Sequence, residues 1–163
     1  MKRVNAIITH PVYREYYDRL EVLEERRPFC CHQMAHLLDV ARIAYIRSLE
    51  DHLDLDKEVI YAAAVLHDIG KSLQYEKKIP HEVSGAEIAE KILNSLPSEM
   101  SFSAGEIRTI LTAIRGHRKP REDAEPLERL LYESDKASRT CFACPAEQEC
   151  DWNAEKKNME ITI

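Results

Sequence analysis

The sequence predicts an all-α fold, and three observations carry that prediction. Apolar residues recur with helical spacing along most of the chain. Only four glycines occur, which disfavours the many tight turns of a β-rich fold. Hydrophobic residues make up 44% and charged residues 32%, as in an ordinary globular domain. We therefore expect a bundle of about six helices followed by an irregular tail that contains cysteines.

Each helix is predicted from an apolar face with helical spacing and from residues that favour the start or the end of a helix. Pro11 suits the first turn of a helix, and the buried run VIYAAAVL ends near Gly70, a residue that favours helix termination. The expected helices cover about Pro11–Arg27, Cys31–Leu49, Lys57–Asp68, Ser84–Leu96, Ala104–Arg115 and Pro126–Ala137. Loops are expected at 72–80 and 115–124. Alternating apolar residues at Met159, Ile161 and Ile163 indicate a short terminal strand.

Length and charge restrict the class of protein. A chain of 163 residues fits a single domain, 1–163, with a core at about 31–139 and a C-terminal cap at about 140–163. We expect a cytoplasmic protein without membrane contact, because neither a signal-peptide core nor a membrane-length apolar run occurs. The net charge of -6 argues against a stable complex with nucleic acid. Whether the chain forms a homodimer is left open.

Two histidines and two aspartates fall beside apolar helical faces. His36 lies within the second expected helix, His67 and Asp68 end the most apolar one, and Asp135 lies near the end of the last. Ionisable groups in such places are costly to bury unless they are paired or bind a metal. Each residue alone is also compatible with an ordinary core or capping role. Together they would form a nitrogen and oxygen site suited to iron, manganese, zinc or a similar divalent ion.

The order of these residues resembles a known superfamily. His36 is followed by Val40-Ala41, then by the block LHDIGK at 66–71, and later by Asp135. This pattern is similar to the HD-domain superfamily of metal-dependent phosphohydrolases, over roughly 32–139. The resemblance implies an HD-type helical fold. It also implies that His36, His67, Asp68 and Asp135 bind one divalent metal. In the mechanism that we expect, Asp68 could also orient the attacking water.

Two further histidines extend the resemblance. His81 opens the fourth expected helix, and His117 follows the fifth. The pattern looks like the subgroup that hydrolyses symmetrical dinucleoside tetraphosphates, in which both histidines would bind a second metal bridged by Asp68. The alternative is that His81 is only a residue at the start of a helix and His117 a loop residue.

A phosphate-binding rim is expected around this site. Lys71 directly follows the HDIG turn and is the first candidate for a catalytic and substrate-binding cation; Arg118 and Arg139 follow it, and Lys136 is weaker. His32 lies one helical turn before His36 and is expected to contact substrate. It could instead be a metal ligand in a shifted register or a group that supports a ligand.

The sequence thus predicts a metal-dependent phosphohydrolase with one or two ions. Its substrate would be a small phosphorylated molecule, most simply a nucleotide. The alternative is a regulatory module that binds metal and nucleotide with little or no turnover, and a third interpretation is a purely structural helical protein.

The five cysteines could either bind a metal or remain as reduced thiols. Cys141, Cys144 and Cys150 form a CxxC pair with a third thiol, and Cys30 or Cys31 could supply a fourth ligand if the tail folds back. That would make a structural zinc or iron–sulfur site. Three reduced thiols in a compact cap are the simpler interpretation, which we favour on the sequence alone.

Overall fold

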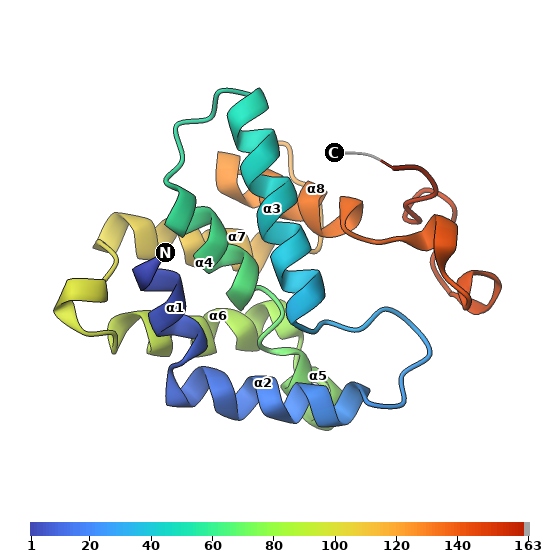
Figure 1. The fold of residues 1–163 in the computed structure, drawn as a ribbon, viewed down its shortest axis with the longest axis horizontal. Coiled ribbons are helices and arrows are strands. Elements are labelled where there is room, and N and C mark those ends of the chain that lie inside the picture. Colours follow the sequence, from blue (N-terminus) through green and yellow to red (C-terminus); the bar gives the residue numbers. More distant parts are fainter. Residues whose placement is uncertain (162–163) are drawn as a thin grey trace.

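The computed structural model describes residues 1–161, and the described chain is helical without strands (Figure 1). It has eight α-helices and three short 3-10 helices. The α-helices are α1 (Lys2–Ile8), α2 (Pro11–Glu24), α3 (Met34–Glu50), α4 (Lys57–Leu66), α5 (Lys71–Lys77), α6 (His81–Asn94), α7 (Ala104–Gly116) and α8 (Pro126–Ala137). The 3-10 helices are η1 (Ser98–Met100), η2 (Cys141–Ala143) and η3 (Glu147–Glu149). The predicted all-α class is confirmed.

The six expected helices correspond to α2, α3, α4, α6, α7 and α8, with ends that differ by a few residues. Two short helices were not expected. α1 buries only Val4 and Ile7, too few residues to show a period. The prediction of a loop at 72–80 is wrong, because α5 occupies most of that segment. The residue that caps its carboxyl end, Lys78, has a left-handed backbone with φ 61°. Only Ser72 of α5 is buried, so its sequence carries no apolar stripe.

The strand expected near the carboxyl end is absent as far as Ile161, and Ile163 lies outside the described residues. In its place the tail makes irregular contacts with the end of α8. The Asn158 side-chain amide donates to the carbonyls of Ala137 at 2.9 Å and Arg139 at 2.7 Å. The tail therefore folds back, and Figure 1 shows it on the same side of the molecule as the loop that joins α2 to α3. From Met1 to Ile161, the helices are too short or too polar to cross a bilayer.

α4 is the centre of the core. Residues 59–66 are all buried, and α4 packs against α1, α3, α7 and α8. Burying a Val, Leu or Ile side chain contributes roughly 1.5–3 kcal/mol, so this helix is well anchored. Its carboxyl end, with the residues that follow, is therefore held deep between α3, α7 and α8.

Gly70 allows α6 to approach the turn after α4. A Cβ at this position would lie 2.4 Å from the His81 carbonyl oxygen and 2.5 Å from the Gly85 nitrogen. Such backbone contacts leave no space for any side chain. The glycine therefore brings the first turn of α6, with His81, against the turn that carries Asp68.

Candidate metal centre

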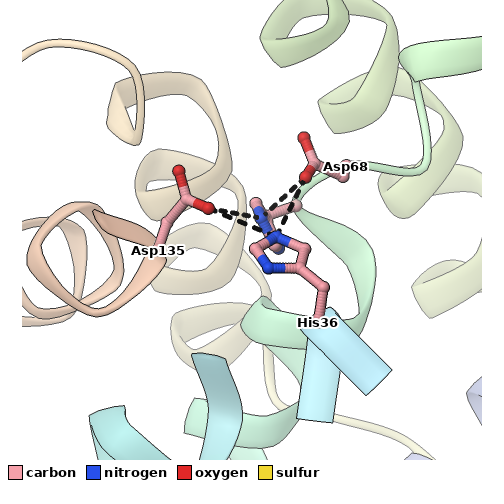
Figure 2. Close-up of side chains that lie close together, drawn as sticks. His36, Asp68 and Asp135 are labelled. Atoms are coloured by element: carbon pink, nitrogen blue, oxygen red, sulfur yellow. Dashed lines mark ion pairs between the residues drawn. The ribbon is translucent and has the colours of Figure 1, made fainter. Parts of the chain in front are cut away.

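Four of the predicted ligands converge from three helices. His36 lies in the first turns of α3, His67 and Asp68 directly follow α4, and Asp135 lies in the last turn of α8. Nε2 of His36 is 3.2 Å from Oδ1 of Asp135 and 3.5 Å from Oδ2 of Asp68. Figure 2 shows the two carboxylates directed from opposite sides toward the imidazoles. The four side chains form one cluster that could hold a metal ion.

His67 is the most deeply placed member, with no exposed surface. Its Nε2 is 3.0 Å from Oδ2 of Asp68 and 3.8 Å from Oδ1 of Asp135. Within the described chain, Nε2 of His67 and Oδ2 of Asp68 are buried and have no hydrogen-bond partner beyond the ion pairs of this cluster. Buried polar atoms are normally satisfied, so this pair points to a missing electrophilic partner.

A second cluster shares Asp68 with the first. Oδ1 of Asp68 is 3.3 Å from Nε2 of His81 and 3.9 Å from Nε2 of His117, and the two imidazole nitrogens are 3.0 Å apart. These three residues also form a group that could hold a metal. One carboxylate oxygen therefore faces each cluster, which is the arrangement that a bridging ligand requires.

Hydrogen bonds to the far ring nitrogens orient three imidazoles. Nδ1 of His67 lies 2.7 Å from the Ala64 carbonyl, and Nδ1 of His117 lies 2.6 Å from the Ile114 carbonyl. Nδ1 of His81 lies 2.5 Å from Oε1 of Gln74. Because these oxygens can only accept, Nδ1 of each ring carries a proton, and Nε2 of each ring faces the site.

The buried carboxylates of Asp68 and Asp135 are stable in their charged form only with positive charge nearby. Burial opposes ionisation of Asp68, but His67 holds its pKa well below the usual range. Burial likewise opposes ionisation of Asp135, and Arg139 lowers its pKa. Burial would lower the pKa of His67, yet the attraction of Asp68 and Asp135 raises it to about 10. Without a metal, His67 therefore retains a proton, which a divalent cation bound at this cluster would displace.

The second cluster is different because its histidines are neutral. Burial lowers the pKa of His81 to about 2 and that of His117 to about 4, although Asp68 opposes both shifts. A neutral imidazole is the form that binds a metal. The residues of both clusters therefore fit a divalent ion in donor type and orientation, and those of the second cluster also in protonation.

A cavity of about 520 Å³ opens onto these clusters. Lys71, Arg118, Arg139 and His32, the predicted substrate contacts, all line it. Lys71 starts α5, and burial lowers its pKa. Arg118 is exposed and pairs with Glu82 at 3.3 Å. Arg139 is buried and donates to Oδ1 of Asp135 at 2.7 Å, so it also supports a metal-ligand candidate.

Sequence reasoning missed the groups that hold these side chains in place. Glu24 is buried in α2 and lies 2.5 Å from Nδ1 of His32; it also accepts from the Tyr75 hydroxyl at 2.7 Å. Gln74 and Tyr75 both come from the unexpected helix α5. No spacing signal links Glu24 to His32, because the irregular loop after α2 brings His32 back to Glu24.

The cysteines are placed differently from the histidines. Cys30, Cys141, Cys144 and Cys150 line the cavity, whereas Cys31 does not. In residues 1–161, neither metal-compatible cluster with ligand atoms within 4.8 Å contains a cysteine. All five cysteines are free thiols.

Comparison with known proteins agrees with this geometry. The family model of the HD domain matches residues 34–140, a range that contains both clusters. The chain belongs to the HD domain family. The predicted resemblance at this level is therefore confirmed.

Several relatives share this HD domain. An uncharacterised protein of Clostridium beijerinckii is 44% identical over 161 residues, covering 99% of each chain. Ribonuclease Y of Oleidesulfovibrio alaskensis is 29% identical over 79% of this chain but only 22% of its own length. The HD domain therefore spans about a fifth of that larger protein. A crystal structure described as a predicted HD superfamily hydrolase, from an uncultured Thermotogales bacterium, has the same fold, with TM-score 0.65 and 22% identity over 97% of this chain and 80% of that one.

Proposed function

We propose that this HD domain is a metal-dependent phosphohydrolase that cleaves a nucleotide or another small phosphate ester or anhydride. The observation that carries the proposal is Asp68, whose two oxygens face two separate donor clusters at the base of a cationic cavity. His36, His67, Asp68 and Asp135 would hold one iron, manganese or zinc ion. Asp68, His81 and His117 would hold a second.

A bound divalent metal would lower the pKa of a water molecule and neutralise charge on the phosphoryl oxygens. The chain's own residues supply the rest. Lys71 and Arg118 line the cavity and can bind phosphate oxygens, while the guanidinium of Arg139 steadies Asp135. Asp68 can also orient water, since its carboxylate lines the cavity.

The lining of the cavity favours a nucleotide. Phe29, Tyr132 and Trp152 line it together with the cations. Aromatic faces stack on bases, and lysine and arginine side chains bind phosphates. A dinucleoside tetraphosphate would use both features at each end of a long anionic chain. The net charge of -6 argues against a long polynucleotide as substrate.

A panel of phosphate compounds tests this proposal. Protein freed of metal is supplied with manganese or ferrous iron and incubated with a dinucleoside tetraphosphate, a nucleoside monophosphate, a cyclic nucleotide or a short RNA. We expect metal-dependent product release from the tetraphosphate in particular. Asp68→Asn should abolish it. Asp39→Asn, on an exposed part of α3, is the matched control and should retain it.

The outcomes separate the alternatives. Metal-dependent nucleotide binding without product release would replace the enzyme with a regulatory module. Preferential cleavage of RNA would overturn the small-substrate assignment. Absence of metal from protein purified without chelator, together with no binding of added manganese or iron, would reject the metal centre itself.

A further inference from the structure

Four cysteines from two distant segments line the same cavity. Cys30 lies in the loop of residues 25–33 that joins α2 to α3, and Cys141, Cys144 and Cys150 lie in the tail after α8. Figure 1 shows the loop and the tail on the same side of the molecule. The fold therefore completes a four-thiol set that the tail sequence alone leaves one residue short.

Two short turns arrange the thiols of the tail. The 3-10 helix η2 begins at Cys141, and the Cys144 amide donates to the Cys141 carbonyl at 3.2 Å. This turn keeps Cys141 and Cys144 close along the backbone, at its start and its end. Cys150 ends the next turn, where its amide donates to the Glu147 carbonyl at 3.3 Å. A CxxC turn of this kind is typical of thiolate sites for metals.

Cys31 provides an internal contrast. Its thiol lies 3.9 Å from the Glu24 carbonyl and 3.6 Å from the Phe29 carbonyl, and it does not line the cavity. A thiol beside two carbonyl oxygens donates to them and so remains protonated. Of the two adjacent cysteines, only Cys30 is placed with the tail.

The spacing and the surrounding charge favour a cluster over a single ion. Zinc bonded to four sulfurs at about 2.3 Å places them about 3.8 Å apart. In residues 1–161, no three cysteine sulfurs lie within 4.8 Å of one another. A 4Fe–4S cluster binds one cysteine per iron and so spreads its ligands. Arg27, Lys156 and Lys157 line the same cavity and can offset the negative charge of such a cluster.

We propose that Cys30, Cys141, Cys144 and Cys150 bind an iron–sulfur cluster that joins the loop before α3 to the tail. This site is separate from the histidine and aspartate clusters and does not depend on their activity. Its position has a consequence for them, because Trp152 lies just after Cys150 and its ring is 5.8 Å from the guanidinium of Arg139. The cluster would thereby fix the cavity wall that contacts Arg139, the partner of Asp135.

Acid-labile sulfide and visible absorption test the proposal directly. The full chain is purified without oxygen and reconstituted with ferrous iron and sulfide. We expect bound sulfide, a broad visible absorption that dithionite bleaches, and an electron paramagnetic resonance signal in the reduced state. Cys144→Ser and Cys30→Ser should each lose the sulfide and the absorption. Cys31→Ser, one residue from Cys30, should keep both.

Controls separate this site from the proposed active site. Sulfide is specific to the cluster, so iron bound by histidines and aspartates does not contribute to it. Asp68→Asn should lose hydrolysis yet retain sulfide and colour. Circular dichroism of Cys30→Ser and Cys144→Ser should show the helical content of the parent, because neither residue lies in an α-helix. A parent protein without sulfide, zinc in place of iron at the cysteines, or equal loss in Cys31→Ser would overturn the proposal.

Discussion

The helical centre and the C-terminal tail both carry side chains that we propose as metal ligands, but these are held by different means. His67, His81 and His117 are buried on packed helices and fixed by hydrogen bonds to their outer nitrogens. Cys144 and Cys150 end short turns and are half-buried. Helix packing positions a ligand before a metal arrives, whereas short turns depend more on the bound group for their order.

The helical centre and the tail also differ in how their charged groups are balanced. Asp68 and Asp135 are buried together, so the helical centre needs a cation to balance them. The tail instead has ion pairs of its own, such as Lys157 Nζ to Oε1 of Glu147 at 2.6 Å. Changes in the centre should therefore affect activity and metal content strongly, and changes in the tail more weakly.

The largest effect is expected from comparing Asp68→Asn with His81→Ala. Asp68 faces both clusters, so its replacement should release both ions and lower kcat/KM by more than about 100-fold, above the range for outer-shell partners. His81→Ala removes a ligand of the second cluster alone and should leave one ion bound. Metal analysis and steady-state kinetics measure both. Equal metal content in the two variants would contradict the bridging role of Asp68.

Gln74→Leu tests the hydrogen bonds that orient the imidazoles. It removes the acceptor for Nδ1 of His81, so metal affinity at the second cluster should fall by about 10–100-fold. Titration of metal-free protein with manganese provides the measurement. Gln148→Leu, on the exposed tail, is the control and should bind as the parent does. An unchanged affinity in Gln74→Leu would show that packing alone orients His81.

Gly70→Ala tests how closely α6 must approach the HD turn. Its Cβ would collide with backbone atoms of α6, and the free energy of unfolding should drop by about 1–3 kcal/mol or more. At Gly105 in α7, a Cβ would meet only Oγ of Ser103 at 3.9 Å. Gly105→Ala should therefore be neutral or stabilise by up to about 1 kcal/mol. Urea denaturation compares the two, and similar effects would argue against the close contact.

The smallest effect is expected from the tail. Trp152→Ala removes a ring 5.0 Å from Nζ of Lys136 and near Arg139, a contribution of about 0.5–1 kcal/mol. KM should rise by a factor of about two to five with little change in kcat. Phe142→Ala is the control, because Phe142 is exposed and does not line the cavity. A large loss of kcat in Trp152→Ala would place the tail within the catalytic machinery and end the contrast with the helical centre.

Much of the fold was predictable because long helices carry their pattern locally. The uninterrupted apolar composition of residues 59–66 predicts a buried helix, and Pro126 predicts the start of α8. The short helices α1 and α5 were not predictable, since each spans only seven residues and buries little. The partners Gln74 and Glu24 were missed for the same reason, because their roles exist only when α2, α5 and α6 are packed.

By itself, the sequence determined the helical class and the order of the histidines and aspartates that marks an HD domain. Only the tertiary structure decided that Asp68 faces two clusters, that Gln74 orients His81, and that Cys30 rather than Cys31 lines the cavity with the cysteines of the tail. The reason is physical: periodicity reports which face of a helix is apolar, a property of neighbours along the chain. Distances between ligand atoms depend on how separate helices and loops pack, and no local pattern records that packing.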